Sequence, residues 1–174
     1  WDKKFGKDTE VWSCASSWRP HKRLSENIRY FLDFAPKDAI FAIAGVIGME
    51  GPFIQIPNDK RIILMGELDY MSLLSLYKRS STFVHLAYLD HCPNVVVDAQ
   101  AAGCKIICSS TGGTSEIVNN GIVIQEETWN FKPIKLYNPP KMEWSAMEQK
   151  IEYEEKPSIV NCSEKYYNIM KEVM

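Results

Sequence analysis

Two aspartates, Asp90 and Asp98, have seven residues between them in a stretch that is otherwise mostly apolar or small. Asp98 interrupts an apolar run, and its carboxylate would be costly to bury without hydroxyl or amide groups that donate hydrogen bonds to it. Asn94, between the two, fits the N-cap of a helix whose first-turn amides are then free to bind an anion. The pattern predicts a polar ligand site at the start of a helix. The alternative is an exposed Asp98 on the outer face of that helix.

A second segment, residues 16–23, is rich in basic side chains. Arg19, His21, Lys22 and Arg23 fall within five positions there. Arg offers a forked set of hydrogen bonds and Lys a compact point charge, and both suit the oxygens of a diphosphate. The segment therefore predicts a diphosphate site, with a solvated surface loop as the alternative.

Two adjacent glycines, Gly112 and Gly113, form a third segment, just before a short helix expected over residues 114–118. Glycine allows close approach to the backbone, and a helix start directs N–H groups toward an anion. Gly-Gly pairs are also common in ordinary turns. This segment alone therefore leaves both roles open.

The elements that must hold these three segments form a regular alternation of strands and helices. Short apolar runs predict strands, and periodic apolar positions between capping residues predict helices. The expected strands cover residues 11–15, 39–46, 61–65, 82–87, 105–108 and 121–124. The expected helices cover residues 25–34, 69–78, 94–102 and 114–118, with caps at Ser25, Asp69 and Asn94 and a terminator at Gly103.

Strands that are apolar throughout are buried on both faces, which is typical of an α/β fold with a doubly wound parallel sheet. Ligands bind such a sheet at the carboxyl ends of its strands, where the three segments lie. We expect a single Rossmann-like sheet in a core spanning residues 1–125. Residues 126–174 are expected to form a proline-containing loop and a C-terminal extension of the same domain, helical from Glu143 onward.

The composition excludes several other classes of protein. A net charge of -2 gives no basis for a nucleic-acid partner. No apolar run approaches the roughly 20 residues that span a bilayer, and no signal peptide opens the chain. Five cysteines at irregular spacing are neither a disulfide framework nor a zinc site, so we expect reduced thiols and a cytoplasmic location. His21, His85 and His91 are expected to be structural or to donate hydrogen bonds rather than to bind metal.

The stretch from Asp90 to Glu116, DHCPNVVVDAQAAGCKIICSSTGGTSE, resembles the donor-binding signature of GT-B glycosyltransferases of the group 1, family-4-like branch. That signature has two acidic positions, a run of small residues and a terminal Gly-Gly-x-x-Glu, and a lysine follows the first strand. The matching residues are Asp90, Asp98, Ala99, Ala101, Gly103, Gly112, Gly113, Glu116 and Lys22. The resemblance covers roughly residues 10–125.

The resemblance implies a retaining transferase that uses a nucleoside-diphosphate sugar, without an obligatory metal or other cofactor. Asp98 would accept hydrogen bonds from the ribose, and Asp90 would lie near the hydroxyls of the donor sugar. Lys22, with Arg19, would neutralise the leaving diphosphate. Asp90 and Lys22 are then the catalytic pair, and the expected substrate-binding residues are Asp98, Arg19, Ser17, His91, Asn94, Val95, Gly112, Gly113 and Glu116.

Members of this family have a second, N-terminal domain that binds the acceptor, and the active site lies between the two domains. We expect such a domain in the parent enzyme, which would be cytoplasmic or peripheral to a membrane. The chain alone, as a fragment, is expected to be inactive.

Three departures from the signature leave the donor's identity open. The family usually has Glu at both acidic positions, Gly at the places of His91 and Pro93, and Arg at the place of Ser17. One alternative is a nucleotide-sugar 2-epimerase, which has the same architecture but lacks the spacing of the two acidic residues. The other is a non-catalytic nucleotide- or phosphate-binding module, which the changes at the acidic positions and at Ser17 would favour.

Overall fold

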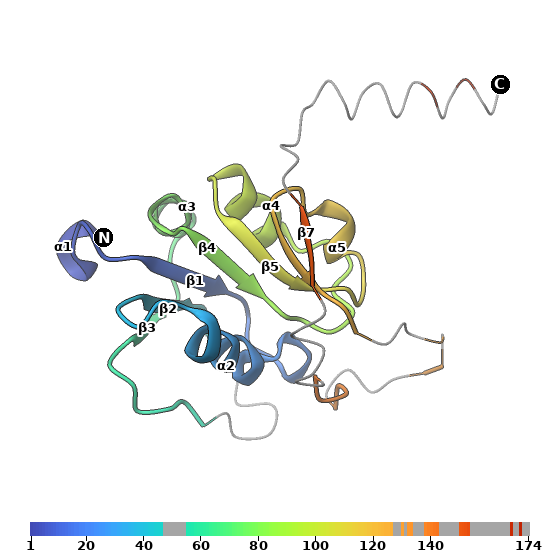
Figure 1. The fold of residues 1–174 in the computed structure, drawn as a ribbon, viewed down its shortest axis with the longest axis horizontal. Helices are drawn as coiled ribbons and strands as arrows, with labels where there is room; N and C mark the ends of the chain where they lie inside the picture. The colour runs from blue at the N-terminus through green and yellow to red at the C-terminus, as the bar shows by residue number, and fades with distance from the viewer. Residues whose placement is uncertain are drawn as a thin grey trace.

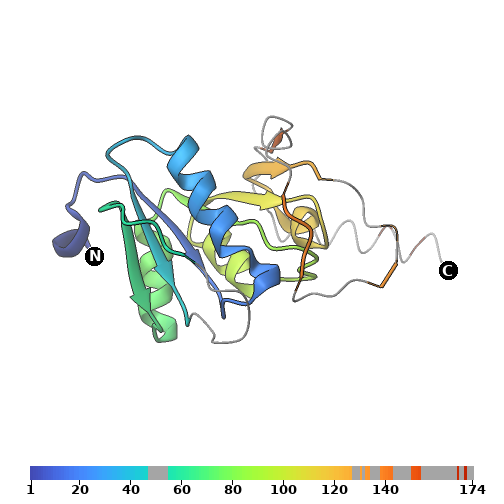
Figure 2. The ribbon, with the colours of Figure 1, turned by 90° about the horizontal axis from the view of Figure 1, so that it is seen from below.

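The computed structural model of the chain describes residues 1–46, 55–126, 130, 132–133, 138–142, 150–153, 168 and 171. A seven-stranded sheet forms its centre, and helices lie on both faces (Figures 1 and 2). The strands are β1 (Val11–Ala15), β2 (Ile40–Ala44), β3 (Ile62–Gly66), β4 (Thr82–His85), β5 (Lys105–Ser109), β6 (Gly121–Ile124) and β7 (Lys150–Tyr153). The helices are α1 (Asp2–Phe5), the 3-10 helix η1 (Pro20–Lys22), α2 (Leu24–Phe34), α3 (Tyr70–Arg79), α4 (Asn94–Ala101) and α5 (Thr114–Ile117).

The strand order is β3-β2-β1-β4-β5-β6-β7. The first six of these strands are parallel, and β7 pairs antiparallel with β6. The order reverses direction between β1 and β4, which are neighbours in the sheet. The doubly wound parallel sheet predicted from the sequence is therefore confirmed, and the reversal marks the point where ligands bind such sheets.

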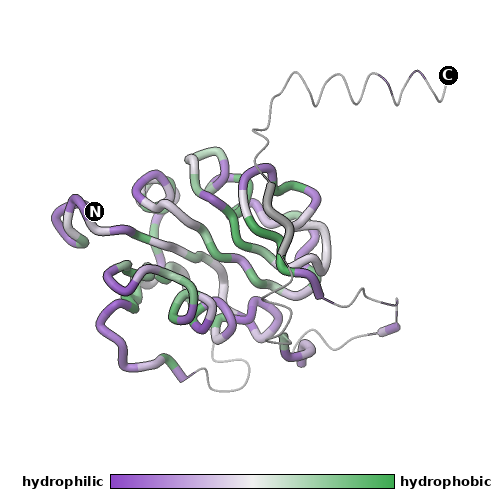
Figure 3. The backbone as a smooth tube through the Cα atoms, viewed as in Figure 1, coloured by the Kyte–Doolittle hydropathy of each residue, from purple (hydrophilic) through white to green (hydrophobic). Residues whose placement is uncertain are grey.

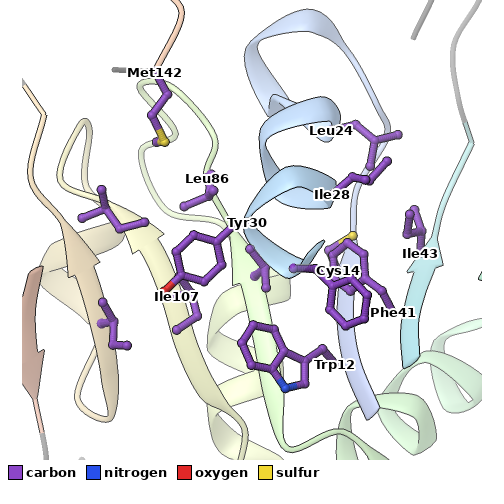
Figure 4. Packing of buried hydrophobic residues seen from close by; sticks show 14 of the residues in the cluster. Trp12, Cys14, Leu24, Ile28, Tyr30, Phe41, Ile43, Leu86, Ile107 and Met142 are labelled. Atoms are coloured by element: carbon purple, nitrogen blue, oxygen red, sulfur yellow. The ribbon is translucent and has the colours of Figure 1, made fainter. Parts of the chain in front are cut away.

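Alternate residues of each strand face opposite layers of the molecule. In β1, Trp12 and Cys14 pack in the cluster that holds α2, whereas Val11 and Ala15 pack in the cluster that holds α3 and α4. Figure 4 shows the first cluster, in which Leu24 of α2 lies over the sheet. Figure 3 shows that hydrophobic stretches are concentrated in the strands. Both faces of the sheet are covered, as the continuous apolar strands predict.

Two helix starts contrast with each other. Asp69 caps α3 as expected, because its Oδ1 accepts a 2.9 Å hydrogen bond from the Ser72 amide. The cap expected at Ser25 is wrong, because α2 begins at Leu24 and its N-cap is Arg23. Arg23 has a left-handed conformation, φ 50, and makes no side-chain cap hydrogen bond.

The predictions for residues 82–87 and for the segment from Glu143 onward also differ from the structure. The strand expected over 82–87 ends at His85, because the next amide, that of Leu86, donates a 3.2 Å hydrogen bond to Asn27 Oδ1 of α2. The helix expected from Glu143 onward is wrong at Lys150–Tyr153, which form β7. Elsewhere in that range only Asn168 and Lys171 are described, and both are helical.

Candidate functional site

The site lies where β1 and β4 end side by side. The chain leaves β1 through η1, which places Lys22 at its end, and leaves β4 through a loop that contains Asp90. A 2.7 Å hydrogen bond from the Tyr88 amide to the His21 carbonyl joins the two loops. Backbone pairing therefore brings together two residues that are 68 positions apart in the sequence, Lys22 and Asp90.

One carboxylate oxygen of Asp90 accepts two hydrogen bonds. Lys22 Nζ donates to Oδ2 and forms an ion pair with it. His85 Nε2, at the end of β4, lies 2.9 Å from the same Oδ2. A carboxylate can only accept, so the proton on Nε2 belongs to the histidine, and this fixes its tautomer. Asp90 is thus held between a lysine of the first loop and a histidine of the adjacent strand.

Opposing influences set the charges of this trio. Burial tends to raise the pKa of Asp90, but hydrogen bonds from His85 and Lys22 together with the lysine charge outweigh it and hold that pKa well below its usual range. Burial lowers the pKa of His85 more than the neighbouring Asp90 raises it. At neutral pH the trio therefore contains one carboxylate, one ammonium and one neutral imidazole.

The glycine pair packs the loop after β5 against the Asp90 loop. Gly112 forms an isolated parallel bridge with Asp90, and the Gly113 amide donates a 2.9 Å hydrogen bond to the Asp90 carbonyl. A Cβ on Gly112, where φ is +81, would lie 2.5 Å from the Asp90 carbonyl oxygen. A Cβ on Gly113 would lie 2.0 Å from the His91 carbonyl oxygen. The close approach that these glycines allow is to the backbone that carries Asp90.

The second aspartate, Asp98, lies on α4 and is half-buried. Pro93, rather than Asn94, is the N-cap of this helix, and no side chain caps it. Burial raises the pKa of Tyr77, and the charge of Asp98 raises it further, so the aspartate is close to that buried phenol. The Tyr77 hydroxyl is itself buried without a hydrogen-bond partner among the described residues. Within the same residues no hydrogen bond joins Asp98 to the Lys22–Asp90 pair.

The remaining predicted side chains do not join the hydrogen bonds of this centre. Val95 is half-buried on the first turn of α4. The other predicted side chains are exposed: Ser17, Arg19, His91, Asn94 and Glu116. The structure therefore brings Lys22, Asp90 and the glycine loop into contact, whereas the other predicted side chains are exposed or half-buried outside these contacts.

Sequence reasoning missed Asn27 of α2, whose side chain is 1% exposed. Its Nδ2 donates to the carbonyls of Lys22, at 3.1 Å, and Arg23, at 2.7 Å. Its Oδ1 accepts from the Leu86 amide just beyond β4. Asn27 thus ties the lysine loop to the end of β4. The available signal was an amide on the apolar face of α2, beside Ile28.

A buried ion pair below the lysine loop was also missed. Arg23 Nη1 donates to both carboxylate oxygens of Glu126, at 2.8 and 2.9 Å, and Nη2 donates to the Pro140 carbonyl at 2.7 Å. Its guanidinium lies 4.9 Å from the centre of the Tyr88 ring. Ser109 Oγ, at the end of β5, donates to Glu126 as well. The pair connects the residue after Lys22 to segments more than 100 positions away, which no local pattern reveals.

The described part of the chain contains no group of three His, Cys, Asp or Glu side chains that could hold a metal ion. The four cysteines in that part are free, with Cys92 exposed and the other three buried. Among the same residues no helix is both long and apolar enough to cross a membrane.

Comparisons with known proteins identify the family of the chain. Solved structures that resemble the chain include HepE from Anabaena in complex with UDP-glucose, at a TM-score of 0.58 and 17% identity over 71% of this chain and 37% of that one. The catalytic domain of starch synthase IV from Arabidopsis thaliana, bound to ADP and acarbose, gives 0.53 and 16% over 68% and 28% of the two chains. WaaG, a glycosyltransferase involved in lipopolysaccharide biosynthesis, gives 0.54 and 16% over 72% and 36%.

At these identities the likeness shows the fold alone, and the chain spans less than two fifths of each relative's length. Comparison with curated protein sequences finds no match. The family model described as "Glycosyl transferases group 1" matches residues 2–133, well over half of the chain. The chain therefore belongs to the group 1 glycosyltransferase family.

Proposed function

We propose that this chain is the donor-binding domain of a retaining glycosyltransferase that takes a hexose from a nucleoside-diphosphate sugar. The observation that carries the proposal is the meeting of Lys22 and Asp90 at the switch point between β1 and β4. That point is where α/β sheets of this type bind nucleotides. A cation and a hydrogen-bond acceptor side by side suit a ligand that joins a phosphate to a sugar.

Lys22 would contact the diphosphate. Negative charge builds on that group as the glycosidic bond breaks, so a fixed cation stabilises the transition state more than the ground state. Arg19, exposed at the N-cap of η1, would add a second positive charge. Asn27 holds the backbone of the lysine loop through the Lys22 carbonyl, so the cation starts from a fixed position.

The two aspartates would bind the two sugars of the donor. His85 and Lys22 use only Oδ2 of Asp90, and no described residue donates to Oδ1. Oδ1 is therefore available to a hydroxyl of the transferred sugar. Asp98 is half-exposed on α4, and its carboxylate would accept hydrogen bonds from the ribose hydroxyls. Five further residues would complete the donor pocket together with Gly112 and Gly113: Ser17, His91, Asn94, Val95 and Glu116.

The acceptor would bind to a second domain of the parent protein, and this chain alone would transfer no sugar. The support is that the chain covers 37% of HepE, which was solved with UDP-glucose and with UDP. The metal-independent mechanism and the cytoplasmic location stay predictions from the sequence.

A thermal-shift screen of this chain against nucleoside diphosphates and their sugar esters tests donor binding, since a ligand that binds only the folded state raises the Tm. We expect at least one nucleotide sugar to raise it. Assays of the full-length protein then test the reaction: an acceptor glycoside with the donor's anomeric configuration supports a retaining transferase. Epimerised nucleotide sugar without transfer would instead identify an epimerase, and binding without turnover would identify a non-catalytic module.

A further inference from the structure

Lys22 and Asp90 neutralise each other. They form an ion pair in which their side chains remain 19% and 15% exposed, so both can be reached by a ligand. His85, on the other side of Asp90, is 4% exposed and uncharged at neutral pH because burial lowers its pKa. It therefore orients the carboxylate without cancelling its charge. The titratable side chains that interact with Asp90 from η1 and β4 are those of Lys22, His85 and His21.

A phosphate that binds to Lys22 must take the lysine's hydrogen bond from Asp90 or share it with Asp90. The carboxylate then lies close to the phosphate as a like charge, which opposes binding. The penalty depends on the charge of the phosphate. The terminal phosphate of a nucleoside diphosphate loses a second proton near pH 6, so at neutral pH it carries about one more negative charge than a phosphate esterified to a sugar.

A sugar on the phosphate affects the affinity of the ligand in a second way. Its hydroxyls can donate hydrogen bonds to Asp90, whose Oδ1 accepts none from the described residues. A hydrogen bond to a charged acceptor is stronger than one to a neutral acceptor. The same carboxylate thus attracts the sugar ester and repels the bare diphosphate.

We infer that Asp90 determines the site's preference for a nucleoside-diphosphate sugar over the sugar-free nucleoside diphosphate, because it competes with the diphosphate for Lys22. This rests on the proposed function, since it assumes that Lys22 contacts the diphosphate. Its consequence for the reaction cycle is that Asp90 favours release of the nucleoside diphosphate once the sugar has left. Asp90 is then a specificity-determining residue as well as a sugar contact.

Isothermal titration of wild type and Asp90→Asn tests the inference. The probes are UDP, ADP and GDP with their glucose esters, and the pair that binds wild type most tightly is used throughout. Asn keeps the volume and an oxygen acceptor for Lys22 and His85 but removes the charge. We expect the variant to bind the diphosphate about tenfold more tightly, as for removal of a like charge beside a phosphate, and the glucose ester no more tightly than wild type does. Asp98→Asn, the matched control, should weaken both ligands by a similar factor.

The Lys22→Ala background separates competition from simple repulsion. If Asp90 competes for the lysine, the gain from Asp90→Asn is smaller when Lys22 is absent, and an equal gain in both backgrounds overturns the inference. Unchanged or weaker diphosphate binding by Asp90→Asn overturns it too. In wild type, which needs no substitution, raising the salt concentration should shrink the preference for the glucose ester, because screening weakens the repulsion. If no probe binds wild type, the proposed function fails; if the probes bind but the preference does not change, only this inference fails.

Discussion

His85 Nε2 lies 2.9 Å from Asp90 Oδ2, and this contact fixes the Asp90 carboxylate to the end of β4. The histidine is buried, so its rotamer is held by packing. The loop that carries Asp90 would otherwise depend on backbone contacts with the glycine loop for its position. The contact therefore ties the loop that carries Asp90 to the end of the strand beside it.

The neutral state of the buried histidine predicts a dependence of stability on pH. Burial lowers the pKa of His85 below its usual value of 6.5, and burial together with the charge of Lys22 also lowers the pKa of His21. Below about pH 6.5 the unfolded chain then binds more protons than the folded chain, so the free energy of unfolding falls as the pH falls. Asp90 adds a loss in the same direction only at much lower pH, because its pKa is depressed. Urea denaturation at pH 7.5 and about 5.5 should show this loss of stability.

The variants His85→Gln and His21→Gln test which histidine causes the change in the free energy of unfolding with pH. We expect His85→Gln to reduce the pH dependence more than His21→Gln does, since His85 is the more deeply buried of the two. An unchanged slope in His85→Gln would show that another group is responsible.

The glycine contacts predict that Gly112→Ala lowers the free energy of unfolding by more than the strain of a positive φ alone would. Its Cβ would meet the Asp90 backbone at 2.5 Å, whereas a Cβ on Gly103, where φ is also positive, would meet nothing within 4 Å. Gly103→Ala should therefore cost only the conformational penalty, about 1–2 kcal/mol, in the free energy of unfolding. Gly112→Ala should cost more than Gly103→Ala and should also weaken nucleotide-sugar binding, because Asp90 moves. Equal losses of stability in the two variants, with normal ligand binding, would contradict the close contact.

Much of the fold is predictable because local patterns and the sheet agree. The strands at 11–15 and 121–124 match β1 and β6 to the residue, since both are short apolar runs with clear ends. The order of strands then brings Lys22 and Asp90 to one edge, which general rules for parallel sheets anticipate. These parts of the structure follow from local apolar runs and from the general rules of parallel sheets.

The remaining features depend on contacts between distant residues. The start of α2 depends on Arg23, whose guanidinium binds Glu126 across 103 positions of sequence. The end of β4 depends on a hydrogen bond from the Leu86 amide to Asn27. β7 has the alternating charged and apolar pattern Lys-Ile-Glu-Tyr, which is the period of a strand, but the charged residues around it favour a helix. In each case a partner far along the chain decides between two locally acceptable structures.

The buried pair of Arg23 and Glu126 predicts a large loss of stability when one partner is removed. Their side chains are 1% and 9% exposed, so Arg23→Met leaves the glutamate charge without its cation in a buried place. Such a loss amounts to about 3–5 kcal/mol in the free energy of unfolding. The matched control is Arg29→Met within α2. The ion pair of Arg29 with Asp33 is exposed, with 3.7 Å between Nε and Oδ2, so the expected loss is below about 0.5 kcal/mol.

A double variant checks the cause of that loss. Arg23→Met combined with Glu126→Leu should recover much of the stability, because an apolar pair replaces the ion pair. Urea denaturation of wild type, Arg23→Met, Arg29→Met and the double variant measures the free energies of unfolding. If the two arginine variants lose equal amounts, the Arg23 pair does not contribute as a buried pair.

The position of Asp98 predicts a role in binding rather than in folding. Its side chain is half-exposed on α4 and makes no hydrogen bond to another described side chain, so Asp98→Ala should change the free energy of unfolding by less than about 0.5 kcal/mol. Two hydrogen bonds from ribose hydroxyls to a carboxylate are together worth about 2–4 kcal/mol, and the variant should lose affinity for the nucleotide accordingly. Wild type should discriminate against the 2′-deoxynucleotide, and the variant should not. Unfolding of the variant with normal nucleotide affinity would assign Asp98 a structural role.

The position of Lys22 predicts that its removal weakens binding of ligands that carry phosphates more than binding of ligands without them. The lysine ends η1 beside Asp90, and its side chain is partly exposed, so it can reach a diphosphate. Lys22→Ala should weaken a nucleoside diphosphate by about 1–3 kcal/mol, the range for a hydrogen bond with a charged partner, and should barely change binding of the bare nucleoside. Raising the salt concentration should narrow the difference between wild type and variant, because a partly exposed ion pair is screened. Isothermal titration of both ligands against both proteins measures these effects, and equal losses for nucleoside and diphosphate would mean that the loop only shapes the pocket.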